Sequence, residues 1–425
     1  MSNDFDVVVI GGSTTGVAAA VSAQRIGAKT CLIEKNGYLG GTATAAFVNR
    51  FQIGYGVRGE GVIRGVFQEI CEGLAELNGI DGDVHKVEAA FDNEALKKVC
   101  MDLCLREGVT LYLHSLVADV HKVDDTIQSV ALLTLGGLRR KIRGKVFIDA
   151  TGNGDVSFMA GADVEIGRPF DGLLQPMTLI FQIKNIDPDE LKKVDFDALW
   201  PRFYRETGIR TPSRRRIVME PMTLSPTTIG LCMNHVKGKN PLDVEELTSA
   251  EIHARDEAYR IYSFFKKNVP GFRDCELITS AEIGIRETRR VMGEYVLNRY
   301  DILGGQKFAD AVGCSTAWID LHNPLGEGVL HEYQPKDEWW EIPYRALLVK
   351  GIDNLLVAGR CISATPEAQS AIRVIPTCIA TGQGAGAAAG LATTRELPLR
   401  SLSIHELQDV LRSQNVWFGQ QDDMG

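Results

Sequence analysis

The chain opens with short apolar runs separated by small residues. Val7–Ile10 is a continuous run of β-branched residues, which is typical of a strand buried on both faces of a parallel sheet. A glycine-rich turn follows, and residues 17–26 predict a helix that ends at Gly27, a natural C-cap. Residues 29–33 predict a second buried strand. The opening therefore predicts one strand–helix–strand unit.

The remaining pattern is similar at the two ends of the chain and different in between. Helices are expected at 61–78, 92–107, 243–267 and 375–391. Strands are expected at 109–113, 117–123, 127–135, 145–149, 175–183, 217–233 and 353–358. This order predicts an α/β fold with a discontinuous Rossmann-like domain, residues 1–160 and 341–425, and an inserted α+β substrate or cap domain, residues 161–340.

Composition narrows the function classes. The net charge of -9 argues against a nucleic-acid partner, which would normally meet a basic surface. No segment reaches the roughly 18 apolar residues that a membrane span needs, and the acidic start does not fit a secretory signal, so we expect a cytoplasmic protein. Nine cysteines without a C-x-x-C pair disfavour a disulfide framework, a metal site and an iron–sulfur cluster. A homo-oligomer stays open.

A dinucleotide fingerprint follows the first strand. Its six positions are Gly11, Gly12, Ser13, Thr14, Thr15 and Gly16. Glycines at such a turn allow close approach of a pyrophosphate, and the helix N-terminus offers N–H groups to it. Glu34, 23 positions after the first glycine, suits the ribose hydroxyls and disfavours a 2'-phosphate. Serine replaces the usual second glycine, so a merely structural tight turn is the alternative.

Four further stretches complete a family pattern. They are Leu39-Gly-Gly-Thr-Ala-Thr44, Ile148-Asp-Ala-Thr-Gly-Asn-Gly-Asp155, Arg286-Glu-Thr-Arg-Arg290 with Gly293-Glu-Tyr295, and Leu356-Val-Ala-Gly-Arg-Cys-Ile-Ser363 running on to Gly390. With the fingerprint, they resemble the FAD-dependent oxidoreductases of the glutathione-reductase-like superfamily, whose members share two dinucleotide-binding motifs. The resemblance covers nearly the whole chain and is specific for FAD but not for substrate.

The resemblance implies one FAD per chain and a set of residues that hold it. They are Gly11, Gly12, Ser13, Thr14, Thr15, Gly16, Glu34, Lys35, Gly40, Gly41, Thr42, Thr44, Val117, Ala150, Thr151, Gly152, Asp155, Gly359, Arg360, Val374 and Thr377. Residues 35–60 contain no histidine or cysteine for a covalent link, so we expect non-covalent FAD. The helix near Pro376 should direct its N-terminus at the flavin, where negative charge develops.

Catalytic candidates come from the insertion and the C-terminal motif. His322 follows an apolar run and precedes a proline two residues on, a placement that can direct a general base into a cleft. A structural or solvated histidine is the alternative. His331 is its closest rival, whereas His235 has a loop-like context beside a lysine. Arg286, Arg289 and Arg290 form a cationic group, one member of which is a candidate for holding a substrate carboxylate. Arg373, in the C-terminal motif, is a candidate for approaching the flavin or the substrate. For the Arg286–Arg290 group, the alternative is an ion-pair network with Glu282, Glu287 and Glu294.

These features together predict an enzyme that moves a hydride between a small hydroxylated or carboxylated substrate and flavin N5. The sequence has no second strand–G-x-G-x-x-G–helix unit, so the substrate itself is the expected electron donor and the acceptor stays unknown. Reduction of an activated double bond is one alternative. A non-catalytic flavoprotein with a structural or redox-sensing role is another.

Overall fold

The computed structural model describes residues 4–52, 56–57, 60–81, 88–211, 219–220, 223–326 and 328–419. The predicted α/β class is confirmed. In these residues a seven-stranded sheet runs in the order β5–β2–β1–β8–β7–β6, and β19 also pairs with β8. The strands are β1 (Asp4–Ile10), β2 (Thr30–Ile33), β5 (Thr110–Tyr112), β6 (Ser115–Val123), β7 (Thr126–Thr134), β8 (Arg139–Asp149) and β19 (Leu355–Val357).

Strand β8 pairs antiparallel along one half and parallel along the other. Its first half pairs antiparallel with β7, and its second half pairs parallel with β1 and β19. The carboxyl ends of β1, β2, β8 and β19 therefore meet at one edge of the sheet. In open α/β sheets, this is the edge at which ligands bind.

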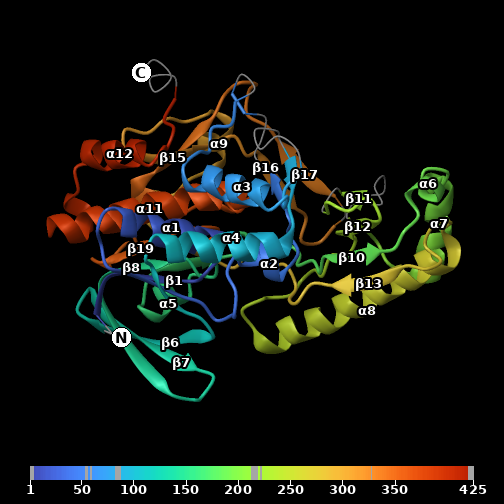
Figure 1. Ribbon diagram of the computed structural model, residues 1–425, viewed down its shortest axis with the longest axis horizontal. Helices are drawn as coiled ribbons and strands as arrows, with labels where there is room; N and C mark the ends of the chain where they lie inside the picture. Colours follow the sequence, from blue (N-terminus) through green and yellow to red (C-terminus); the bar gives the residue numbers. More distant parts are fainter. Residues whose placement is uncertain are drawn as a thin grey trace.

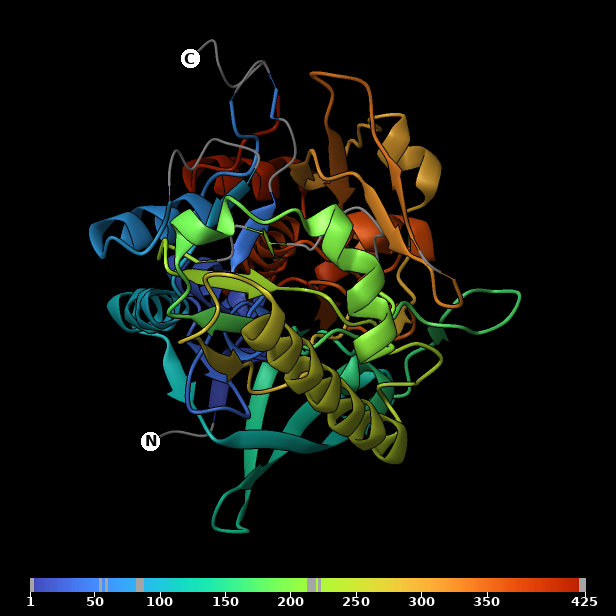
Figure 2. The ribbon, with the colours of Figure 1, turned by 90° about the vertical axis from the view of Figure 1, so that its right-hand side faces the viewer.

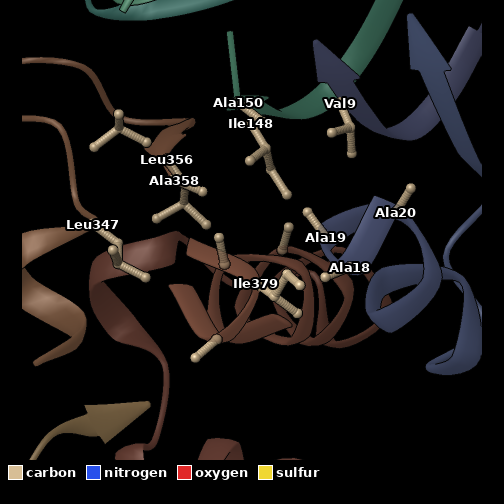
Figure 3. Close-up of a cluster of buried hydrophobic side chains, with 14 of the residues drawn as sticks. Val9, Ala18, Ala19, Ala20, Ile148, Ala150, Leu347, Leu356, Ala358 and Ile379 are labelled. Carbon is tan, nitrogen blue, oxygen red and sulfur yellow. The ribbon is translucent and has the colours of Figure 1, made fainter. Parts of the chain in front are cut away.

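Two helices pack against each other beneath the sheet. They are α1 (Thr14–Arg25) and α11 (Ile375–Arg395), and Figure 3 shows their small side chains gathered under Val9 and Ile148 of β1 and β8. The contact depends on glycine. A Cβ at Gly386 would lie 2.1 Å from the Ala19 carbonyl oxygen, and one at Gly382 would lie 2.2 Å from that of Thr15. The glycines of α11 thus permit close helix packing.

A second sheet and a long helix form a smaller unit at one side of the molecule (Figures 1 and 2). Its strands run in the order β11 (Met219–Glu220), β12 (Thr228–Leu231), β10 (Phe181–Lys184) and β13 (Glu276–Thr279). The helices are α6 (Pro188–Leu191), α7 (Phe196–Thr207) and α8 (Val244–Asn268). Asp243 caps α8 by accepting from the N–H groups of Glu245 and Glu246. An apolar cluster of its own runs from Met177 to Ile283.

The two expected strands in this unit are shorter than predicted. In the stretch 175–183 regular pairing begins only at Phe181, since Pro176 has no N–H and the residues after it form isolated bridges. The stretch 217–233 holds β11 and β12 as separate short strands. Residues 217–218 and 221–222 of that prediction lie outside the described part of the chain.

The segments before and after this unit belong to the large core. Their strand pairs are β9 (Val164–Ile166) with β14 (Arg289–Val291), β15 (Ala311–Ser315) with β18 (Trp340–Pro343), and β16 (Ile319–His322) with β17 (Val329–Glu332). Val291, Ile319 and Trp340 join the same apolar cluster as the main sheet. We therefore propose a substrate unit of about residues 174–285, narrower than the predicted insertion 161–340.

Short elements complete the described chain. They are α2 (Thr42–Ala45), β3 (Arg50–Gln52), α3 (Val66–Glu76), β4 (Glu88–Ala90), α4 (Asn93–Arg106), α5 (Asp155–Met159), α9 (Arg299–Leu303), η1 (Tyr344–Ala346), α10 (Pro366–Ile372), η2 (Leu399–Ser401) and α12 (Ile404–Ser413). A search of the described helices for one both long and apolar enough to cross a bilayer finds none.

Candidate functional site

The loop between β1 and α1 has no room for side chains at its glycines. Gly11 has φ +102°, and a Cβ there would lie 2.4 Å from the Ala150 carbonyl oxygen. A Cβ at Gly16 would lie 1.8 Å from the Gly11 carbonyl oxygen. Ser13 is the N-cap of α1, and its side chain makes no capping hydrogen bond. The first N–H groups of the helix are thus left to a ligand, as a phosphate site requires.

The serine that departs from the fingerprint is accommodated by a neighbouring glycine. Ser13 and Gly40 form a parallel bridge, and the Gly40 N–H donates to the Gly12 carbonyl at 2.9 Å. A Cβ at Gly41 would fall 2.6 Å from the Ser13 Cβ. The side chain lost from position 41 therefore makes space for the one gained at position 13. Thr42 begins α2, and the Thr44 hydroxyl donates to the Gly41 carbonyl at 3.1 Å.

Glu34 lies at the end of β2 and points back at the same loop. One carboxylate oxygen accepts from the Gly12 N–H at 2.6 Å and the other from the Asn36 N–H at 2.8 Å. Burial raises the pKa of Glu34, although these two N–H groups oppose the shift. The Glu34 carbonyl accepts from the Ser115 N–H, which brings β6 and Val117 to this end of the site. The Lys35 side chain lies at the surface near Glu282.

The loop after β8 is braced by a buried carboxylate. Asp149 accepts from the Thr151 hydroxyl at 2.7 Å and from the Ser157 N–H at 2.7 Å. Arg360 donates to the carbonyls of Gly152 and Ile285, each at 2.8 Å. These bonds join the end of β8, the loop after β19 and the segment before Arg286 in one place.

The N-terminus of α11 comes to the same edge. Its N-cap, Val374, provides no side-chain cap, and the Gly359 N–H donates to the Thr381 hydroxyl about two turns further on. A Cβ at Gly359 would meet Thr15 of α1 at 3.2 Å. The Thr377 and Ser315 hydroxyls lie 2.7 Å apart, both buried. Both α1 and α11 therefore begin at this edge of the sheet without a side-chain cap.

The predicted base, His322, lies in a cluster of polar side chains. Its Nδ1 is 3.2 Å from Nε2 of His235, and its Nε2 is 3.5 Å from Oδ2 of Asp320. Asp320 also contacts Arg373 at 2.9 Å and His331 at 2.9 Å. The structure thus brings together both predicted members, His322 and Arg373, and adds two residues that sequence reasoning did not select, His235 and Asp320.

Burial and neighbouring charges determine the protonation states of Asp320, His322 and His235. Burial opposes ionisation of Asp320, but His322, His331 and Arg373 hold its pKa well below the usual value. Burial and the Arg286 charge lower the pKa of His322 to about 4. Burial lowers the pKa of His235, and Arg286 lowers it further. At pH 7 the cluster therefore holds one carboxylate and two neutral imidazoles.

The predicted arginines separate in the structure. Arg286 donates to the Pro176 carbonyl at 2.6 Å and to the Thr178 hydroxyl at 2.8 Å. Among the described residues, no carboxylate lies within ion-pair distance of its guanidinium. Arg289 instead contacts Asp155 at 2.9 Å, away from the histidines.

The alternative of an ion-pair network applies to Arg290, the neighbour of Arg289. Arg290 and Glu287 are both buried and lie 2.6 Å apart. Glu282 and Glu294 have other partners, Lys35 and Arg400. Of the predicted cationic group, Arg286 is therefore the member that makes no ion pair in the described part of the chain.

Arg373 also has an unused donor. Its Nη2 donates to the Asp320 side chain and carbonyl, while its Nε is buried without an acceptor anywhere in the described chain. It directly precedes the N-terminus of α11. An orphaned guanidinium nitrogen in this position indicates a ligand with an acceptor atom.

A cavity of about 390 Å³ adjoins the cluster. It is lined by Arg168, Leu173, Gln175, Glu287, Leu321, His322, Asn323, Pro324, Gly328, Val329 and Leu330. The Gln175 side chain accepts from the His322 N–H at 3.3 Å and so holds the cavity wall to β16. The volume suits a small molecule.

A family model matches most of the chain, and two curated relatives match a short part of it. A model of the family "FAD dependent oxidoreductase" matches residues 6–411. Dihydrolipoyl dehydrogenases of Trypanosoma brucei brucei and Arabidopsis thaliana are 52% identical over 40 residues and 56% identical over 41, about a tenth of this chain. The chain spans only 8% of the length of either relative.

Solved structures match more of the chain at lower identity. A geranylgeranyl bacteriochlorophyll reductase-like protein from Thermoplasma acidophilum is 14% identical, with a TM-score of 0.45, over 97% of this chain and 84% of its own. The p-nitrophenol 4-monooxygenase of Pseudomonas putida DLL-E4 is 12% identical, with a TM-score of 0.46, over 97% and 85%.

The residues present fit the cofactor of the matched family. A dinucleotide requires a loop whose glycines leave no room for a Cβ, a helix start without a side-chain cap, and an acidic side chain such as Glu34, and all three are present. The match extends through all of these elements and on to α12. The chain belongs to the FAD dependent oxidoreductase family, and its cofactor is FAD.

Proposed function

We propose that this enzyme removes a hydride from a carbon of a small hydroxylated or carboxylated substrate. The observation that carries the proposal is the Arg286 guanidinium, which has no carboxylate partner in the described chain, beside two neutral imidazoles. A carboxylate or hydroxyl of the substrate would complete the hydrogen bonds of this arginine. Arginine is suited to that role because its planar fork binds carboxylates bidentately.

The protein's own contribution is orientation and proton handling. When bound, FAD supplies the hydride acceptor. Arg286 and the orphaned Nε of Arg373 would hold the substrate oxygens, and the His235–His322 pair would take the hydroxyl proton. The uncapped N-terminus of α11 would favour negative charge beside it. The residues on the FAD side of the site, including Glu34, Thr151 and Gly359, would bind the cofactor. Arg289 would support that side through its ion pair with Asp155.

An anaerobic screen tests the proposal. FAD-loaded protein is mixed with small hydroxy acids, sugar acids and polyols, and loss of the flavin's visible absorption band is recorded. We expect at least one carboxylated or hydroxylated compound to bleach the wild type, and Arg286→Met to need much more of it. A flavin that stays oxidised with every compound would support the non-catalytic alternative. Bleaching that is equally efficient in Arg286→Met would remove the arginine from substrate binding.

NADH and NADPH should be poor reductants of this flavin. The fingerprint formed by β1, residues 11–16 and α1 is not followed in the sequence by a second strand–G-x-G-x-x-G–helix unit for a nicotinamide nucleotide. We expect slow anaerobic bleaching by either nucleotide in a stopped-flow spectrophotometer. Rapid bleaching by one of them would show that the nicotinamide binds elsewhere on the protein.

Glu34→Ala should weaken FAD binding by about 10- to 100-fold, since a hydrogen bond to a charged group contributes about 1.5–3 kcal/mol. The measurement is the Kd for FAD from flavin fluorescence. We do not assign the Lys35 side chain to FAD, because it contacts Glu282 at the surface, and Lys35→Ala is therefore the matched control. Because the pKa of Glu34 is raised, wild-type affinity should also begin to fall at a higher pH than for an ordinary glutamate as the pH is lowered. Unchanged FAD affinity in Glu34→Ala would show that other groups hold the ribose.

Denaturation of the protein should release free FAD, because no covalent link is expected. Residues 35–60, which lead from the ribose end of the site to α2 and β3, contain no histidine or cysteine. We expect acid precipitation to release all of the yellow colour into the supernatant. Colour that remains with the precipitated chain would reveal a covalent link.

A further inference from the structure

Histidine 235 is held in place by the hydrogen bonds of the residues before and after it. Asn234 is buried, accepts from the Leu179 N–H at 2.9 Å and donates to the Ala254 carbonyl. Val236 is buried and exchanges backbone hydrogen bonds with Met177. The side chains before and after His235 thus point into the core of the smaller unit. His235 itself is half-buried and reaches His322 of β16 instead.

The charges around His322 determine which of its nitrogens carries the proton. Asp320 is held by Arg373, by His331 and by the Ser370 hydroxyl, which accepts from its N–H. Its Oδ2 lies 3.5 Å from Nε2 of His322. An unprotonated Nε2 would set a lone pair against a carboxylate, so this nitrogen carries the hydrogen. Nδ1 of the neutral ring is then an acceptor.

The same reasoning extends to His235. Its Nε2 faces the acceptor Nδ1 of His322 at 3.2 Å and must therefore carry the hydrogen of that contact. Nδ1 of His235 is left as the basic nitrogen, and no hydrogen-bond donor reaches it from the described residues. Both nitrogens of His322 are thus engaged, whereas His235 has one available.

We propose that His235 is the catalytic residue that accepts the substrate's proton, and that Asp320 and His322 are positioning residues that orient it. This rests on the proposed function. As the hydride leaves the substrate carbon for FAD, the hydroxyl O–H bond breaks and its proton moves to Nδ1 of His235. The positive charge formed is shared through His322 towards the Asp320 carboxylate. The substrate alcohol would thus become a carbonyl, with its hydride passed to FAD, the two-electron acceptor, and its proton held on His235.

The position of Arg286 agrees with this assignment. Arg286 Nη2 lies 3.9 Å from Cys232 Sγ, three residues before His235 and on the same segment. A substrate held by Arg286 would lie near this segment.

Nitrogen NMR of isotope-labelled histidines in the FAD-loaded full-length protein tests the tautomers without any substrate. Signals are assigned with His235→Gln and His322→Asn. We expect His235 with a protonated Nε2 and an unprotonated Nδ1, and His322 with a protonated Nε2. In His322→Ala, the His235 tautomer preference should be lost. A protonated Nδ1 on His235 in the wild type would overturn the proposal.

Flavin reduction gives the second measurement, with lactate, malate and gluconate as probes. For a probe that bleaches the wild type, His235→Ala should lower the rate by about 10²- to 10⁴-fold while FAD is retained. His322→Asn places an amide oxygen near the former Nδ1, so it should be faster than His322→Ala. A normal rate in His235→Ala would overturn the proposal. If no probe bleaches the wild type, the proposed function fails for these compounds, and the NMR result still decides the role of His235.

Discussion

We expect His322→Ala to reduce its FAD about 10²- to 10⁴-fold more slowly than the wild type, because His235 would lose the acceptor that orients it as the general base. The variant should keep its FAD, because the cofactor-binding loop and Glu34 are not in contact with this side chain. It should also keep its fold, since β16 is held to β17 through the backbone. The rate is measured by anaerobic stopped-flow absorbance.

His331→Ala is the matched control for this prediction. Its imidazole contacts the same carboxylate, Asp320, but lies at the surface. We expect a much smaller change in rate. If His322→Ala reduces its flavin normally, or simply loses FAD, the histidine has a structural role and no part in the proton step.

The pH dependence follows from the low pKa of His322. The ring is neutral above a pKa of about 4, against an ordinary 6.5. The reduction rate should hold as the pH falls from 7 and drop near 4, where protonation removes the acceptor nitrogen. Because the unfolded chain takes up this proton at the higher pH, stability should also decline as the pH falls from 6.5 towards 4. Circular dichroism at each pH separates the two effects.

The second large effect is expected from Gly386→Ala in α11. The new methyl group would lie 2.1 Å from the Ala19 carbonyl oxygen of α1, a distance that forces the two helices apart. Overpacking costs about 1–3 kcal/mol and sometimes more, against a gain of about 1 kcal/mol from the better helix former. Because the clash is with backbone, we expect a net loss of about 2 kcal/mol or more in the free energy of unfolding.

Gly390→Ala is the graded comparison in the same helix. Its Cβ would lie 3.0 Å from the Ala23 carbonyl oxygen, so a small shift of the neighbour relieves the contact. We expect a change within about 1 kcal/mol, since the gain in helix propensity offsets the strain. The thermal midpoint of both FAD-free variants is measured by differential scanning calorimetry. Equal midpoints would show that α1 and α11 are not held at this distance in solution.

The nucleotide half could be predicted from the sequence because its signals are local. The run Val7–Ile10, the glycines of residues 11–16 and the acidic residue at the end of the next strand are close along the chain. The structure turns them into β1, a loop with no space for a Cβ, and a carboxylate that accepts from Gly12. The compensating pair of Ser13 and Gly41 could not be read in the same way, since it depends on a contact across the turn.

The substrate side was harder to predict because its contacts are distant in sequence. His235 and His322 are 87 positions apart, and nothing local marks them as partners. The sequence pattern around His235 predicts a loop near a lysine. The alternation of buried Asn234 and Val236 around it is the signal that could have indicated a side chain directed away from the core. Likewise, the pairing of Arg289 with Asp155 rather than with a substrate depends on β14 crossing to β9.

The most direct test of hydride transfer at this site is an isotope effect on flavin reduction. A compound that bleaches the wild type is prepared with deuterium on the carbon that carries its hydroxyl, and the anaerobic reduction rate is compared with that of the unlabelled compound. We expect the deuterated compound to reduce the flavin distinctly more slowly, in the wild type and in Arg286→Met at saturating substrate. Equal rates for the two compounds in both proteins would contradict transfer of a hydride from that carbon.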